Sequence, residues 1–187
     1  MELMREVRAG VSLPIFAMVR PRGGNFLYSA AEFEEMKRSI EVARSVGMDG
    51  VVFGLLRDDR SVDVERTAEL VRAAVSLPVT FHRAFDECAD LLAALEDVVA
   101  TGAARLLTSG GAAKAPEAVG RIAELVRRAG SRLIIVAGSG ITAGNVEEIA
   151  AATSAAEIHA GLSSVVAEDA GGEAFEAEVR RLVEAVD

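Results

Sequence analysis

The feature that most constrains the fold of this chain is a repeat, in which short apolar runs alternate with stretches of helical periodicity. The runs are Ile15–Val19, Gly50–Phe53, Val79–His82, Arg105–Thr108, Leu133–Val136 and Glu157–His159. Their first residues lie roughly 24 to 35 positions apart, which is the length of a strand, a helix and two short loops. The spacing therefore predicts a repeated strand-helix unit.

The runs are apolar on both faces, and consecutive parallel strands need helical crossovers, so the pattern predicts a parallel sheet covered by helices. Polar or glycine-rich segments of similar character follow the runs, which favours a ring of loops around one axis over an open sheet. The chain opens with a helical pattern that no strand precedes. We therefore expect a TIM-type (β/α) barrel that is incomplete at its N-terminus, with six of the eight strands, in a single domain over residues 1–187.

Composition excludes several classes of function. Acidic residues outnumber basic residues 29 to 20, so general affinity for nucleic acid or anionic membrane is not expected. The single cysteine, Cys88, rules out an internal disulfide, and the sequence shows neither a secretory signal pattern nor an apolar run long enough to cross a bilayer. We expect a cytoplasmic protein, with Cys88 in the core or at an interface.

Two arginines follow the first run. Arg20 and Arg22 flank Pro21 and precede Gly23 and Gly24, an arrangement that suits a carboxylate or a phosphate because guanidinium groups bind both with paired hydrogen bonds. The alternative is a solvated loop whose arginines pair with the acidic surface. Their place at a strand end favours anion binding.

The third run leads directly into three polar side chains, those of His82, Arg83 and Asp86. Ligands of parallel α/β folds lie beyond the carboxyl ends of the strands, so we expect these residues to share a pocket with Arg20. His82 could then move a proton, Asp86 could orient the His82 ring, and Arg83 could contact an anion. The alternative is a buried core histidine next to a structural Arg83–Asp86 ion pair.

Two later runs end in small residues, and the last run ends in a histidine. Small residues allow backbone N–H groups to approach a ligand, and late barrel loops often bind phosphate, but glycine-rich turns also simply connect strands to helices. A strand-end histidine is either a metal ligand or a core residue, and no Cys/His cluster with zinc or copper spacing accompanies it. These residues are Ser109, Gly110, Gly111, Gly138, Ser139, Gly140 and His159, with Ser163 and Ser164 after the histidine.

In their order and spacing, four segments resemble signatures of the CutC family, which is described as a family of copper homeostasis proteins. The segments are Arg20–Ser29, Val79–Asp86, Leu107–Gly111, and Ala137–Ile141 with Asn145. The resemblance covers residues 14 to 164 and implies a TIM barrel, a cytoplasmic homodimer and copper binding. It also implies two further N-terminal strands with cysteine-bearing segments. Copper(I) prefers thiolate and thioether ligands, and this chain offers Cys88 and five methionines.

Two functions are therefore expected, with a third left open. In the first, the chain is a copper homeostasis protein that holds copper through His82 and His159, with Cys88 as a further ligand. In the second, it is an enzyme that acts on a small phosphorylated or carboxylated substrate. The arginines and glycine loops then bind the anion, and His82 and Asp86 carry out general acid/base chemistry. In the third, the incomplete barrel is a scaffold or a fragment without function. A homo-oligomer is expected in addition, because a barrel that lacks strands exposes its edges.

Overall fold

The computed structural model describes residues 2–161, 166 and 171–186, so Ser163 and Ser164 lie outside the described residues. The chain forms two compact units, residues 1–106 and 107–187. The expected single domain stays a prediction.

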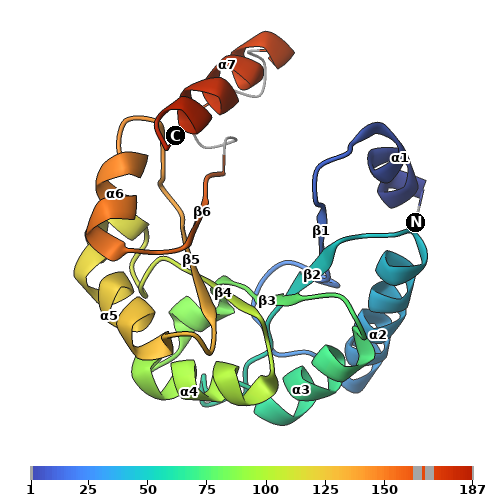
Figure 1. Cartoon of the computed structure of the whole chain (residues 1–187). Helices are drawn as coiled ribbons and strands as arrows, with labels where there is room; N and C mark the ends of the chain where they lie inside the picture. The colour runs from blue at the N-terminus through green and yellow to red at the C-terminus, as the bar shows by residue number, and fades with distance from the viewer. Residues whose placement is uncertain (1, 162–165, 167–170, 187) are drawn as a thin grey trace. The chain divides into compact units, whose positions relative to one another are not determined.

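The first unit is a parallel α/β arrangement in which strands pair in the order in which they occur along the chain. The register aligns Phe16 with Gly50, Val51 with Val79 and Thr80 with Arg105. Helices α2, α3 and α4 cover one face of these strands (Figure 1). The elements are α1 (Glu2–Gly10), β1 (Phe16–Met18), α2 (Ala30–Ser45), β2 (Gly50–Phe53), α3 (Val64–Ala73), β3 (Val79–Phe81), the 3-10 helix η1 (Arg83–Glu87), α4 (Leu91–Thr101) and the start of β4 (Arg105–Thr108).

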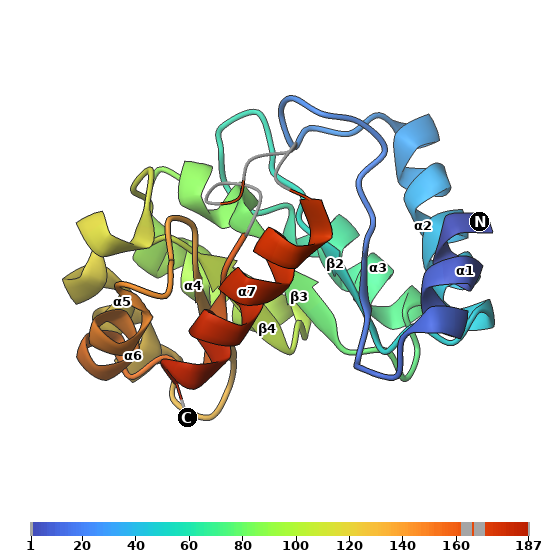
Figure 2. The ribbon, with the colours of Figure 1, turned by 90° about the horizontal axis from the view of Figure 1, so that it is seen from above.

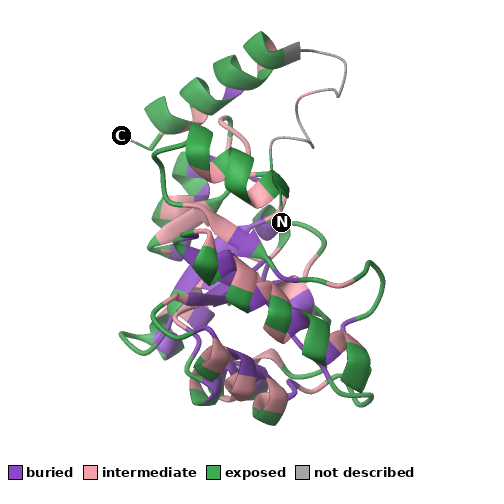
Figure 3. Ribbon diagram, turned by 90° about the vertical axis from the view of Figure 1, so that its right-hand side faces the viewer, coloured by how far each residue is buried: buried purple, intermediate pink, exposed green. Residues whose placement is uncertain are grey.

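The second unit continues the alternation. Strands β5 and β6 are parallel, with Val136 opposite Glu157 and Gly138 opposite His159. Helix α5 packs against α6 and β5. Helix α7 is exposed along most of its length (Figure 3). The elements are the end of β4, η2 (Ala115–Glu117), α5 (Val119–Ala129), β5 (Ile134–Gly138), α6 (Val146–Thr153), β6 (Glu157–His159) and α7 (Gly171–Glu184).

The predicted fold class is confirmed, because the described residues contain six strands that alternate with helices in an incomplete TIM-type α/β fold. Each predicted run contains or overlaps one strand. The main difference is at β5, which begins at Ile134 and extends to Gly138, so the first of the glycine positions expected in a loop belongs to a strand.

Buried residues lie on the strands and on the helix faces that cover them (Figure 3). In the first unit, Phe53 and Phe81 are fully buried on β2 and β3, and Met36 and Ile40 are fully buried on one face of α2. These strands end at a common edge, and the loops that follow β1 and β2 lie side by side there (Figure 2). The backbone N–H of Leu56 links the two loops by donating to the Phe26 carbonyl at 3.0 Å.

Within the described residues, no helix combines the length and the apolar character that crossing a membrane requires. Strand β1 begins the strand order and β6 ends it. Met18 on β1 is 54% exposed, as expected for a strand at a sheet edge. The homo-oligomer that such an edge suggests stays a prediction.

Candidate functional site

His82 lies directly after β3, where the backbone leaves the sheet. Its N–H donates to the Phe53 carbonyl at 2.9 Å, which extends the pairing of β3 with β2 by one residue. The backbone of His82 is extended, and the chain then turns into η1. As the N-cap of this turn, the His82 side chain accepts a hydrogen bond at Nδ1 from the Ala84 N–H at 3.2 Å. The local backbone therefore fixes the direction of the imidazole ring.

The imidazole of His82 is enclosed, with only 4% of the residue exposed. The Phe26 ring meets it edge-on, with 4.8 Å between ring centroids, and Phe81 lies at 6.2 Å. Gly54 leaves room on another side, because a Cβ atom there would lie 2.6 Å from His82 Nδ1. An aromatic ring pair and a glycine thus shape the site around one histidine.

The enclosure keeps His82 neutral. Burial lowers its pKa from 6.5 to about 4, although a backbone hydrogen bond opposes that change, and the positive charge of Arg20 lowers the pKa further. Because Nδ1 accepts the Ala84 N–H, the proton of the neutral ring must be on Nε2. This buried Nε2–H has no acceptor among the described residues. A buried donor without a partner is unusual in a native protein and calls for an explanation such as a ligand.

Arg20 lies close to this donor. Its Nη2 donates to the Gly24 carbonyl at 2.7 Å, and its guanidinium stacks on the Phe26 ring at 4.7 Å from the centroid. Arg20 therefore brings a positive charge next to the neutral His82. The structure brings these two predicted site residues together.

Arg22 holds the loop rather than reaching beyond it. Its Nε forms an ion pair with Glu32 at 2.6 Å, and Nη1 and Nη2 donate to the Asn25 side chain at 3.1 Å and the Leu27 carbonyl at 2.5 Å. Glu32 also accepts the Ser29 N–H at 2.7 Å as part of the capping box of α2. Arg22 thereby attaches the segment before Ser29 to a helix. Its predicted contact with an anion stays a prediction.

Arg83 and Asp86 form an ion pair within η1, with 2.8 Å between Arg83 Nε and Asp86 Oδ2. The Asp86 side chain is 7% exposed and that of Arg83 is 39% exposed. This geometry suits the structural pair that the sequence left open as an alternative. The proposed influence of Asp86 on His82 and the anion contact of Arg83 stay predictions.

The two glycine-rich segments of the second unit contact each other. The Ser139 hydroxyl donates to the Ala113 carbonyl at 2.9 Å, and the Ser139 carbonyl accepts the Ala115 N–H at 2.9 Å. The Ser109 hydroxyl donates to the Ala112 carbonyl at 2.6 Å. Gly110, Gly111 and Gly140 have positive φ, the left-handed region that glycine tolerates. Both serine hydroxyls bond to loop carbonyls, and anion binding by these segments and by Gly138 stays a prediction.

Among the described residues, no group of three or more His, Cys, Asp or Glu side chains could hold a metal ion. His82 and His159 belong to different units, so their pairing stays a prediction. Cys88 is partly buried, and its thiol lies 3.9 Å from the Ala84 carbonyl. Burial and the nearby Asp97, Asp86 and Glu87 carboxylates raise the pKa of this thiol to about 12, which disfavours the thiolate that copper needs.

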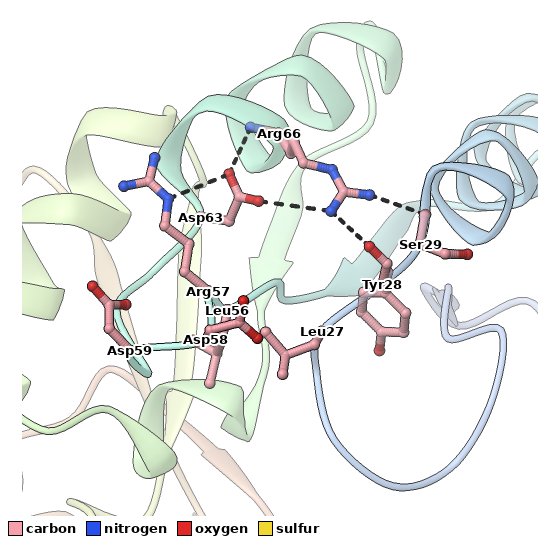
Figure 4. A pocket seen from close by; sticks show the side chains of 9 residues that line it. All are labelled: Leu27, Tyr28, Ser29, Leu56, Arg57, Asp58, Asp59, Asp63 and Arg66. Atoms are coloured by element: carbon pink, nitrogen blue, oxygen red, sulfur yellow. Dashed lines mark hydrogen bonds and ion pairs between the residues drawn. The ribbon is translucent and has the colours of Figure 1, made fainter.

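A cavity of about 640 Å³ opens elsewhere in the first unit, and none of the predicted site residues lines it (Figure 4). Arg66 lines this cavity and donates to the Tyr28 carbonyl at 2.8 Å and to the Ser29 carbonyl at 3.2 Å. The sequence carried a signal for it, since charged residues follow β2 as they follow β1 and β3. The lining residues are Leu27, Tyr28, Ser29, Leu56, Arg57, Asp58, Asp59, Asp63 and Arg66.

Comparison with known proteins points to one family. The sequence profile described as the CutC family matches residues 1–164. A family protein CutC of Chromobacterium violaceum is 49% identical over 160 residues, which cover 86% of this chain and 65% of the relative. The copper homeostasis protein cutC homolog of Mus musculus is 43% identical over 159 residues, 85% of this chain and 58% of that protein. The chain thus spans less than two thirds of the length of either relative.

A solved structure gives the same result. The crystal structure of a CutC protein from Streptococcus agalactiae superposes with a TM-score of 0.81 at 31% sequence identity, covering 85% of this chain and 79% of that one.

Proposed function

Because this chain belongs to the CutC family, we propose that it takes part in copper homeostasis, as the name of the mouse relative states for that protein, and that it does so by binding a small anionic ligand. The anion is bound by Arg20 and His82 at the end of β3. The chain's own side chains do not form the copper site in this proposal.

The buried Nε2–H of His82 is the observation that carries the proposal. It is a neutral donor without an acceptor among the described residues, and the Arg20 guanidinium is near enough to lower the pKa of the same ring. An oxyanion would accept hydrogen bonds from both groups and would also be attracted by the Arg20 charge. A cation would meet an N–H hydrogen and a positive charge, and both repel it.

The donor chemistry of the described residues fits copper poorly. The Nδ1 atom of His82 already accepts a hydrogen bond, and its Nε2 atom carries the proton, so neither nitrogen offers a lone pair. The pKa of the Cys88 thiol is raised to about 12, so a metal ion would have to displace a proton that this thiol holds more tightly than an ordinary cysteine does. Copper binding through His82, His159 and Cys88 therefore requires a rearrangement of His82 and the loss of a proton from Cys88.

An enzymatic role at the same site is the second candidate, and the neutral state of His82 favours one form of it. With a pKa of about 4, the ring is a weak base, so it polarises a bound oxygen as a hydrogen-bond donor more readily than it removes a proton. A substrate with a phosphate or carboxylate group fits this role. Asp86 and Arg83 would then support the turn that carries His82.

Calorimetric titration with inorganic phosphate tests the anion site. We expect wild-type protein to bind phosphate, and Arg20→Ala to weaken binding roughly 10-fold or more, the effect of removing one hydrogen bond to a charged group. Arg38→Ala is the matched control, because Arg38 is exposed on α2 away from His82. Equal phosphate binding by wild type and Arg20→Ala would contradict the proposal.

Competition for copper(I) tests the proposal that the side chains of this chain do not form a copper site. We expect a strong copper(I) chelator to retain the metal when mixed with this chain, since the donors that copper(I) prefers are protonated or absent from the site. Retention of one equivalent of copper by the protein would restore direct copper binding as its function.

A further inference from the structure

Three buried side-chain polar atoms lack a hydrogen-bond partner among the described residues, namely Tyr28 Oη, Thr67 Oγ1 and His82 Nε2. The function proposed above uses only the last of them. Native proteins satisfy most buried polar groups, because an unmade hydrogen bond in the interior costs stability. Tyr28 therefore needs an explanation of its own.

The backbone fixes the position of the Tyr28 side chain. Its carbonyl accepts a hydrogen bond from Arg66 Nη1 at 2.8 Å, while the ring points away from Arg66 and Asp63 (Figure 4). Only 6% of the residue is exposed. The hydroxyl is thus withdrawn from water and held on the side of the segment that does not face Arg66.

Tyr28 and His82 share a neighbour. Burial raises the pKa of Tyr28, and the charge of Arg20, the approach of its N–H groups to the phenol oxygen and the charge of Arg22 oppose this rise. Because a guanidinium only donates, this approach gives the Tyr28 hydroxyl proton no acceptor. Arg20 is also the residue whose charge lowers the pKa of His82. The guanidinium of Arg20 therefore lies close to two buried side-chain donors that lack acceptors.

We propose that Tyr28 is a ligand-binding residue, whose hydroxyl donates a hydrogen bond to the same oxyanion that Arg20 and His82 bind. This inference rests on the proposed function and deepens it. At neutral pH the phenol and the imidazole are uncharged donors, and the guanidinium supplies the positive charge. Three donors around one charge select an anion with at least two oxygen atoms, either a phosphate or a carboxylate.

The guanidinium of Arg22 stacks on the Tyr28 ring at 5.3 Å from its centroid. His82 lies beneath Arg20 and Phe26, because Arg20 stacks on the Phe26 ring and that ring contacts His82. Entry of an anion to His82 therefore requires Arg20 and Phe26 to shift. On binding, Arg20 exchanges its contact with the Gly24 carbonyl for one with the ligand. The hydroxyl of Tyr28 then has an acceptor, and the cost of leaving it without one in the free protein is removed.

Tyr28→Phe tests the inference, since it removes only the hydroxyl. We expect calorimetric affinity for inorganic phosphate to fall roughly 10-fold or more. The melting temperature of the ligand-free variant should be unchanged or higher, because the lost hydroxyl had no partner. Thr67→Val is the matched control, because it removes another buried hydroxyl without a partner. It should change the melting temperature in the same direction and leave phosphate affinity unchanged. Titration with succinate in parallel decides whether the anion is a carboxylate or a phosphate.

The outcomes separate the two proposals. If Tyr28→Phe binds as wild type does, while Arg20→Ala binds weakly, the role of Tyr28 is wrong and the anion site remains. If wild-type protein binds neither phosphate nor succinate, the anion site is wrong and the role of Tyr28 fails with it. A lower melting temperature for ligand-free Tyr28→Phe, or an equal loss of affinity in Thr67→Val, would show a structural role instead and overturn the inference.

Discussion

The two histidines of this chain stand at equivalent places in the repeat and have different environments. His82 follows β3, is 4% exposed, and is held by the Ala84 N–H and the Phe26 ring. His159 ends β6 and is exposed. Partial removal from water lowers the pKa of His159, whereas for His82 burial and the Arg20 charge together lower it to about 4.

The difference shows that a position at the end of a parallel strand allows a functional site to form but is not sufficient for one. After β3, the histidine caps a turn, a glycine makes room for its ring, and Phe26 in the loop after β1 covers it. At the end of β6, His159 stands opposite Gly138 of the neighbouring strand. Side chains from other loops, and not the strand end itself, make His82 a candidate functional residue.

The largest expected effect is the pH dependence of stability. Because the pKa of His82 falls from 6.5 in the unfolded chain to about 4 in the folded one, the unfolded chain binds the proton more tightly. The contribution of His82 is complete above pH 6.5 and falls by about 3 kcal/mol as the pH drops to 4. Chemical unfolding of wild type and His82→Gln at several pH values measures this contribution. The difference between the two free energies of unfolding removes the pH dependence that the carboxylates cause, because both proteins contain them. His159→Gln should remove a smaller part of the pH dependence of stability. If His82→Gln and His159→Gln remove equal parts, the two histidines do not differ as described.

The next effect concerns packing. His82→Ala removes a buried ring from between Phe26 and Phe81, and we expect it to lower the free energy of unfolding by about 2 to 3 kcal/mol. His159→Ala changes an exposed side chain and should stay within about 0.5 kcal/mol. Denaturant titrations at pH 7.5, where neither ring is charged, give both values. Similar losses for the two variants would mean that His159 is also a packed residue.

Two glycines provide a finer test of the same contrast. A Cβ atom at Gly54 would lie 2.6 Å from His82 Nδ1, and that ring is fixed on several sides, so Gly54→Ala should cost about 2 kcal/mol. A Cβ atom at Gly138 would also lie 2.6 Å from its nearest neighbour, but this is the terminal methyl of Leu107, which can rotate away. Gly138→Ala should therefore cost about 1 kcal/mol or less. Thermal unfolding compares the stability losses of the two variants. A larger loss for Gly138→Ala than for Gly54→Ala would contradict the conclusion that the His82 ring is rigidly held.

The smallest effect is electrostatic. Removing the Arg20 charge in Arg20→Ala should move the pKa of His82 slightly upward, because a positive neighbour no longer opposes protonation. The pKa of His159 should not change, since burial alone lowers it. Titration of both imidazoles by nuclear magnetic resonance measures the two pKa values in one experiment, with Arg38→Ala as the control. An equal movement of both would indicate a general change in the protein.

The sequence was sufficient for the strands and for part of the site. β-branched runs at regular spacing located the six strands of the described residues, because burial on both faces demands such runs. Position at a strand end singled out Arg20 and His82. It also singled out Arg22, which the structure shows bonded to Glu32 and to its own loop, because a guanidinium that binds a ligand and one that binds a loop look the same in sequence.

Tyr28 and the cavity near Asp63 were not predicted. A tyrosine in a loop carries no sign of whether its hydroxyl will find a partner, and that depends on how the loop after β1 folds over β3. The charged run that begins at Arg57 lies in the loop after β2 and could have been singled out by the argument that was applied to the other loops. The absence of a complete metal-ligand set among the described residues also became visible only in three dimensions.

The sequence by itself determined the parallel α/β repeat, the family and the place of His82 after a buried strand, because hydrophobic periodicity and local motifs act over a few residues. Only the tertiary structure decided that His82 is neutral, that Arg20 lies close to it, and that the Tyr28 hydroxyl is buried without a partner among the described residues. Burial and charge act through space, and the residues around His82 are Phe26 in the loop after β1, Gly54 after β2 and Phe81 at the end of β3.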